Sequence, residues 1–344
     1  MPSIDAPLLN ARPRLRIDGA NKSELMDAVL AMDVRLPRSG MGSAELRVLN
    51  WSGMDFVFLD VRLGQRIELF LSESATRPIF AGDITAIEER YGDGAPQLVL
   101  LAEDALHKLA RNRQTQVFEN MSIDSVVRQI ASGAGLSANV QAGTASATWL
   151  QNNESDLAFL LRLLTPLDVG LRIQDGSLRA RDEEADPAPV RLAPGALAEH
   201  IRIIADLNRQ PSTVTVKGYD LESAADTQSS SSSLSPSPAG STAARYLGSN
   251  SWRTEAVFPH PFARSQDEAQ ALARKRFQQA ARRFLYGEIV CRDTPDLSAG
   301  REVELFDVSR RIAGRYLVVE CRHLFDSDLG LRTHLRVQRP DWNA

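Results

Sequence analysis

The sequence predicts a mainly β protein with an inserted α+β module, and two observations support this prediction. In the first and last thirds of the chain, short runs rich in β-branched residues recur between glycine and asparagine turns. The middle third instead carries helical patterns, with apolar residues three and four positions apart. We therefore expect two similar β-barrel-like domains and a small α/β module within the 344 residues.

The expected domain boundaries follow changes in composition. Residues 1–114 would form the first β-barrel domain, residues 115–190 the α/β module and residues 191–344 the second β-barrel domain. The last region also predicts a long helix at 265–284, because Ser265 can act as its N-cap and a glutamate follows three residues later.

Residues 226–244 differ from the rest of the second barrel. They are rich in serine, proline and glycine, and such a composition buries little surface. We expect a disordered surface loop there, since strand patterns resume on both sides.

A weak internal repeat supports the prediction of two barrels. GQRIELFL begins at Gly64 and GREVELFD begins at Gly300. Three glycine pairs share nearly the same offset, of 236, 232 and 236 residues: Gly64 with Gly300, Gly82 with Gly314, and Gly94 with Gly330. Since the order is kept over three strands and occurs twice, it indicates two similar domains and not a solenoid.

The acids of QNNESDLAFLLRLL are the first candidates for catalysis. Glu154 and Asp156 could in principle be the paired carboxylates of a hydrolase. Two residues apart on a helix, however, they diverge by about 200°. We interpret them as a helix start, with Asn153 as N-cap and Asp156 at the third helical position.

The leucines that follow predict one buried face of this helix. Leu157, Leu160, Leu161 and Leu164 have helical spacing, and Pro166 should end the helix. Residues 171–181 then read as a hairpin around Asp175-Gly176. A second helix should begin after Ser122 as N-cap.

Composition and motifs exclude several classes of function. The formal net charge of −4 gives no electrostatic basis for nucleic-acid binding, so we expect no sequence-specific contact with DNA. Neither a signal peptide nor a run of about 18 apolar residues is present, which predicts no membrane anchor. Cys291 and Cys321 are isolated in apolar strand patterns, and buried reduced thiols are favoured over a bridge between them.

No residue is expected to be catalytic, to bind a cofactor or to bind a metal. The histidines at 107, 200, 260, 323 and 334 are scattered, and only His323 and His334 could meet across a terminal hairpin. Two imidazoles without a nearby acid make a poor metal site. SGAGLSA at 132–138 ends a helix, whereas a dinucleotide loop must begin one.

Two long motifs resemble the phage late control protein D family of contractile-tail baseplate hubs, which is related to the hub half of type VI secretion valine-glycine repeat proteins. QNNESDLAFLLRLLTPLDVGLRI is similar to one family signature. The family's terminal motif is matched by Thr294, Pro295, Leu297, Gly300, Gly314, Tyr316, Val318, His323, Gly330 and Thr333. FAGDITAIEE resembles a third family strand, so the likeness covers nearly the whole chain.

The resemblance implies a structural, non-enzymatic protein of the virion tail baseplate, assembled in the cytoplasm of a host bacterium. It implies a ring-forming homotrimer around a central channel, which adapts a six-fold tail tube protein to a three-fold spike. Other baseplate proteins and the tape measure would be further partners. Since type VI homologues continue beyond the residues that match Trp342 to Ala344, we expect the spike to be a separate protein. The alternative is a cell-wall-binding or wall-degrading tail component, because residues 121–140 resemble part of a LysM unit.

Overall fold

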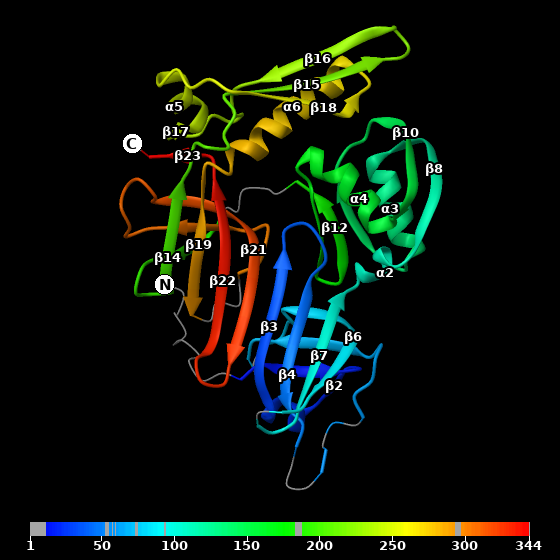
Figure 1. The fold of residues 1–344 in the computed structure, drawn as a ribbon, viewed down its shortest axis with the longest axis vertical. Coiled ribbons are helices and arrows are strands. Elements are labelled where there is room, and N and C mark those ends of the chain that lie inside the picture. Colours follow the sequence, from blue (N-terminus) through cyan, green and yellow to red (C-terminus); the bar gives the residue numbers. More distant parts are fainter. Residues whose placement is uncertain are drawn as a thin grey trace.

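The structure is a computed structural model that describes residues 12–51, 55–56, 58, 60–72, 75–92, 94–182, 188–292 and 297–343. The described chain is mainly β, as the sequence predicts. Figure 1 shows a long sheet in the lower half of the molecule, with a compact α/β module beside it and a thin helix-backed layer above. Thr294 and Pro295 of the terminal motif, and residues 183–187 of the expected α/β module, lie outside the described residues.

One sheet of 13 strands joins the first and last thirds of the chain. From the first third come β1 (Arg14–Ile17), β2 (Ala20–Asn21), β3 (Val29–Pro37), β4 (Ser43–Leu49), β5 (Arg66–Phe70), β6 (Phe80–Arg90) and β7 (Gln97–Asp104). From the last third come β13 (Val190–Leu192), β14 (Ala198–Ala205), β19 (Leu285–Arg292), β20 (Glu302–Leu305), β21 (Gly314–Asp326) and β22 (Gly330–Arg339). The neighbours follow the order β14-β19-β22-β21-β3-β4-β7-β6-β5-β1-β2, with β20 on β21 and β13 on β20.

Alternation along the strands buries one face of this sheet. In β4, Ala44, Leu46 and Val48 are buried, while the residues between them stay partly exposed. The first-third strands and α1 (Ser23–Asp27) share one hydrophobic cluster that includes Leu25. The last-third strands build a second cluster, which includes Tyr316. One continuous sheet therefore covers two hydrophobic cores.

The α/β module lies between these two groups in the sequence. It contains β8 (Arg113–Ser122), β9 (Ala138–Gln141), β10 (Ser146–Ser155), β11 (Gly170–Gln174) and β12 (Ser177–Arg181), with helices α2 (His107–Ala110), α3 (Ile123–Gly133), α4 (Asp156–Leu164) and the 3-10 turn η1 (Thr165–Leu167). The Ser122 hydroxyl accepts a hydrogen bond from the Ser125 amide, which confirms the predicted N-cap. The predicted hairpin is also confirmed, with Asp175 and Gly176 both at positive φ in its two-residue turn.

The predicted N-cap of α4 is wrong by two residues. Ser155 caps this helix, because its hydroxyl accepts from the Ala158 amide at 3.2 Å, and Asp156 is the first helical residue. Asn153 remains in β10, which pairs with β8 as far as Ser155. The paired strand therefore delays the helix. Along α4, Leu161 is only partly buried, whereas Phe159 is fully buried.

The predicted disordered loop at 226–244 is wrong. Residues 225–231 form β16 (Ala225–Ser231), which pairs along its whole length with β15 (Thr213–Asp220). Thr227 is buried, and its hydroxyl donates to the Ala263 carbonyl at 2.8 Å. Since α6 (Gln266–Ala281) contacts both strands, a serine-rich segment gains a buried face that its composition does not predict.

Helix α6 begins as predicted, because the Ser265 hydroxyl accepts from the Glu268 amide, and it ends three residues before the expected position. It backs a sheet of β16, β15 and β18 (Glu255–Ala263), drawn at the top of Figure 1. The remaining elements are β17 (Ser241–Thr242), α5 (Ala243–Ser249) and β23 (Asp341–Trp342), with β17 paired to β23. Residues 191–344 thus hold a separate α/β layer besides their share of the long sheet.

Candidate functional site: a duplicated strand unit

Two groups of five strands repeat the same topology. Within each group the strands pair in the order β3-β4-β7-β6-β5 and β14-β19-β22-β21-β20, and every pair is antiparallel. The chain also visits them in the same sequence. The sixth strand differs, since β1 is antiparallel to β5 whereas β13 is parallel to β20.

Backbone hydrogen bonds fix the residue-by-residue correspondence. The Gly64 amide donates to the Ile84 carbonyl at 2.8 Å, and the Gly300 amide donates to the Val318 carbonyl at 2.8 Å. Both glycines have positive φ, +82° and +86°, a conformation that favours glycine. A β-bulge follows Ile84 in its pairing with β7, and another follows Val318 in its pairing with β22. Ile84 and Val318 are therefore structural counterparts.

The bulges at the other end of the unit agree with this correspondence. In β3 the register shifts between Val29 and Ala31, and in β14 it shifts between Ala198 and His200. Such bulges rarely coincide by chance, because each needs an extra residue at one position of one strand.

The predicted pairing of Gly82 with Gly314 is wrong by two residues. Gly82 lies opposite Ile67, and the residue in its place in the second unit is Tyr316, opposite Val303. Glycine is required at the two positions for different reasons. A Cβ on Gly82 would come within 2.2 Å of the Glu103 carbonyl oxygen, whereas Gly314 opens its strand at φ +129°.

The two units are fused through β21 and β3. Residues 320–326 pair antiparallel with residues 31–37, and Arg322 donates to both carboxylate oxygens of Asp33, at 2.7 and 2.5 Å. Burial raises the pKa of Asp33, but the Arg322 guanidinium outweighs it, so the pKa lies below its ordinary value. On the buried face Phe325 lies opposite Met32 and is only 6% exposed.

The other face of the sheet carries alternating charges. Arg202 lies opposite Glu288, Glu288 opposite Arg336, and Arg336 opposite Glu320. Opposite charges in directly facing positions stabilise neighbouring strands and cancel much of each other's field. Positive and negative side chains therefore alternate across these four strands.

A buried ion cluster attaches the module to the first unit and to the end of α6. Asp168, between η1 and β11, accepts from Arg38 at 3.2 Å and from Arg282 at 2.5 Å. Arg38 also donates to the Asp168 carbonyl at 2.6 Å. Beside it Gly170 is required, because a Cβ there would lie 2.6 Å from the Arg38 carbonyl oxygen.

The two acids considered for catalysis have separate structural partners. The Arg162 guanidinium contacts Glu154 at 2.5 Å and lowers the pKa of that carboxyl group, an effect larger than the opposing one of burial. Asp156 instead accepts hydrogen bonds from the amide groups of Gln114 and Gln151. The two carboxylates stabilise the junction of β8, β10 and α4.

The histidines do not converge either. His323 is buried, with Nδ1 2.9 Å from the Thr333 hydroxyl and Nε2 3.4 Å from the Cys321 thiol, and burial lowers its pKa to about 4. His334 lies opposite Arg322 on the other face, so His323 and His334, which the sequence left as the one pair that could meet, do not meet. The described residues contain no cluster of metal-binding side chains.

The remaining sequence candidates are dispersed. Cys291 and Cys321 are both buried, and neither forms a disulfide bond. His107 Nε2 lies 2.8 Å from an Asp83 carboxylate oxygen, at the point where β7 leads into α2. His200 and His260 are exposed.

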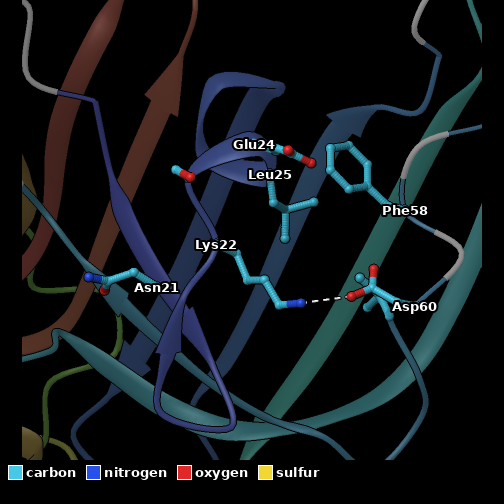
Figure 2. A pocket seen from close by; sticks show the side chains of 8 residues that line it. Asn21, Lys22, Glu24, Leu25, Phe58 and Asp60 are labelled. Carbon is cyan, nitrogen blue, oxygen red and sulfur yellow. Dashed lines mark hydrogen bonds and ion pairs between the residues drawn. The ribbon is translucent and has the colours of Figure 1, made fainter.

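A small hollow of about 160 Å³ beside α1 also fails as an active site. Figure 2 shows Lys22 reaching across it to Asp60, an ion pair of 2.7 Å, with Leu25 and Phe58 behind. Lys22 and Asp60 thus neutralise each other, and Glu24 lines the hollow beside them. Among the described residues, no helix has the length and apolar character needed to cross a membrane.

Several solved structures have a fold similar to that of this chain. The 43 kDa tail protein of prophage MuSo2 from Shewanella oneidensis has a TM-score of 0.76 at 13% identity, covering 96% of this chain and 99% of that one. A tail protein from Neisseria meningitidis has a TM-score of 0.70 at 15% identity, covering 95% and 96%. The c3393 protein of E. coli, a type VI secretion component, has a TM-score of 0.62 at 14% identity, covering 94% and 76%. The chain has the fold of these tail proteins.

A family model described as phage tail baseplate hub (GPD) matches residues 39–329. The chain therefore belongs to the phage tail baseplate hub family, as the motifs at 151–173 and near the end of the sequence indicate. A comparison with curated protein sequences gives no significant match.

Proposed function

We propose that this chain is a structural, non-enzymatic baseplate hub that forms a homotrimer in a contractile phage tail or a phage-derived particle. The trimer would join a six-fold tail tube to a three-fold central spike and leave a channel through its centre. The observation that supports this proposal is the duplicated five-stranded unit, with its matching bulges and glycine turns.

The duplication explains how symmetries could be matched. A tube built from rings of six subunits offers six equivalent docking surfaces, and three chains match them only if each supplies two similar units. The same three chains keep three-fold symmetry toward a spike. Residues 1–114 and residues 191–344 would each provide one unit of the ring. Residues 115–190 would form a module outside it.

The exposed sheet face suits the wall of such a channel. A basic wall would retain DNA through the release of counterions. The facing pairs Arg202 with Glu288 and Arg336 with Glu320 instead balance one another. A passing polyanion would meet no strong attractive field.

The cell-wall alternative has less support. Hydrolysis of the glycosidic bonds of the wall generally uses two carboxyl groups that converge on one bond. Glu154 and Asp156 each accept hydrogen bonds from their own separate donors and do not share one site. Binding to purified peptidoglycan in a pull-down would favour the alternative.

Native mass spectrometry of the purified chain, alone and with its tube and spike proteins, tests the proposal. We expect a trimer at micromolar concentration, and electron microscopy of the complex should show a ring with a central hole. A protein that stays monomeric even beside both partners would contradict the proposed function.

A further inference from the structure

The layer formed by β16, β15, β18 and α6 has two exposed ends of different chemistry. Strand β15 begins at Thr213, whose amide donates to the Thr254 carbonyl beyond α5, and ends at Asp220, where the turn into β16 starts. Its eight residues span about 23 Å, so the two ends do not touch within one chain. Figure 1 draws the turn at the upper right and α5 at the upper left.

The turn between β15 and β16 is acidic and carries an exposed leucine. Leu221 is 82% exposed, and Glu222 and Asp226 are exposed beside it. The Asp220 carboxylate accepts a hydrogen bond from the Glu222 amide at 2.9 Å, which fixes the turn. An element that is already ordered loses little conformational entropy when a partner binds it.

The net charge of this hairpin is negative. From Thr213 to Ser231 the sequence contains three acids and one cation, Lys217. Lys217 lies opposite Gln228 on the paired strands, three residues before the turn begins. The turn itself therefore combines an apolar side chain with unneutralised acids.

The opposite end of the layer combines a tryptophan with arginines. Trp252 is 61% exposed just after α5, and its amide donates to the Leu247 carbonyl at 2.9 Å. The Thr254 hydroxyl donates to the Gln210 carbonyl at 3.0 Å, which brings the loop before β15 to the same place. Three arginines are exposed on these adjoining segments and, with Trp252, form what we call the Trp252 patch: Arg209, Arg245 and Arg253.

The charge of the Trp252 patch is not neutralised. Its three guanidinium groups form no ion pair within the part of the chain that the structure describes. The nearby acids have donors of their own, since Asp206 accepts from the Asn208 amide at 2.8 Å and Glu255 accepts from the Thr215 hydroxyl. Tryptophan and arginine are enriched among the residues that carry binding energy in protein interfaces. The patch thus fits an acidic segment with an apolar side chain.

We propose that the β15–β16 turn of one protomer docks on the Trp252 patch of the next. This inference rests on the proposed homotrimer and adds a contact outside the long sheet. Leu221 would cover the Trp252 ring, while Glu222 and Asp226 would pair with the arginines of the patch. Opposite charges would then fix the orientation of a contact whose centre is apolar.

The two surfaces also suit a closed assembly. Each chain has one β15–β16 turn and one Trp252 patch, at opposite ends of the same layer, so their contact is head-to-tail. A head-to-tail contact uses every surface only when the ring closes. In a trimer, three such contacts would join the three layers into a belt above the sheet.

Cysteine cross-linking tests the contact. The double variant with Leu221→Cys and Trp252→Cys should give covalent dimers and trimers with a short bifunctional maleimide, because the two thiols meet only between protomers. Cys291 and Cys321 are fully buried and should not react. The matched control is Leu221→Cys with Leu329→Cys, since Leu329 is equally accessible in the β21–β22 turn, and it should lose most of the cross-linked product.

A charge exchange provides the second measurement. Glu222→Arg and Arg253→Glu should each raise the concentration needed for half-maximal trimer formation by roughly fivefold, and the double exchange should restore it. Circular dichroism checks that each variant is folded. Trimers that form at the wild-type concentration in all variants, without selective cross-linking, would overturn this contact and leave the hub proposal standing. Absence of any trimer, even with tube and spike present, would overturn both.

Discussion

Asp168 and Arg282 form a buried ion pair of 2.5 Å although 114 residues separate them in the sequence. Arg38, from the β3–β4 turn, completes the cluster from a third part of the chain. One carboxylate thus links the module, the first strand unit and the helix that precedes β19. Arg282 directly follows Ala281, the last residue of α6, so the ion pair connects the end of this helix to the module.

Asp168→Asn should weaken the contact between these three parts and lower the free energy of unfolding. Removing one partner of a buried ion pair leaves uncompensated charge, and we expect a loss of about 3 kcal/mol in the free energy of unfolding. Urea unfolding measures it. The matched control is Asp182→Asn, since Asp182 pairs with Lys275 at the surface, and it should cost less than about 1 kcal/mol. Equal effects in the two variants would show that the Asp168 cluster is not a structural link.

Helix α4 distinguishes a structural from a catalytic role of its acids. Leu160→Asp should destabilise the module by several kcal/mol, because Leu160 is fully buried and an unpaired carboxylate would take its place. Glu154→Gln and Asp156→Asn should each cost about 1 kcal/mol or less. Melting temperature and tail infectivity are measured for all three. A stable acid variant that abolishes infectivity would contradict the structural role.

Within the serine-rich segment, replacement of the residues that pair with β15 should destabilise the protein, whereas replacement of the unpaired residues should not. A Gly-Ser sequence of equal length in place of residues 225–231 removes the buried Thr227 and its hydrogen bond, and should cost about 2 kcal/mol. The same replacement at 235–239 leaves the β15·β16 pairing intact and should change the melting temperature little. Limited proteolysis gives an independent readout, since only the first variant should expose new cleavage sites.

The contribution of His323 to the free energy of unfolding should fall between pH 6.5 and pH 4. Burial lowers the pKa of His323 to about 4, so below pH 6.5 the unfolded chain binds this proton and the folded chain does not. The loss approaches about 3 kcal/mol. His323→Gln lacks this term, so the difference in free energy of unfolding between wild type and variant should shrink as the pH falls.

Asp104 provides the opposite control. Burial raises its pKa to about 6, so the folded chain takes up this proton before the unfolded chain does, and stability from this group rises as the pH falls from 6 to 4. In Asp104→Asn this gain is lost. If both variants shifted the pH profile in the same direction, the assignment of these two groups would be wrong.

The sequence by itself determined the features that depend on neighbouring residues. The Ser122 and Ser265 caps, the Asp175-Gly176 hairpin and the alternation along strands such as β4 follow from local chemistry, and each was predictable. The glycine repeat also identified Gly64 with Gly300, because both turns need a positive φ.

Only the tertiary structure decided the features that depend on distant partners. A serine-rich segment became β16 because β15 and α6 offered hydrogen bonds and a surface to pack on. The start of α4 moved to Ser155 because β8 holds β10 as a strand up to that residue. The fused junction is the clearest case: Arg322 binds Asp33 across 289 residues, and no local pattern specifies which strand edge will meet which. Pairing between edges depends on the register of whole strands, which is fixed only when the sheet is assembled.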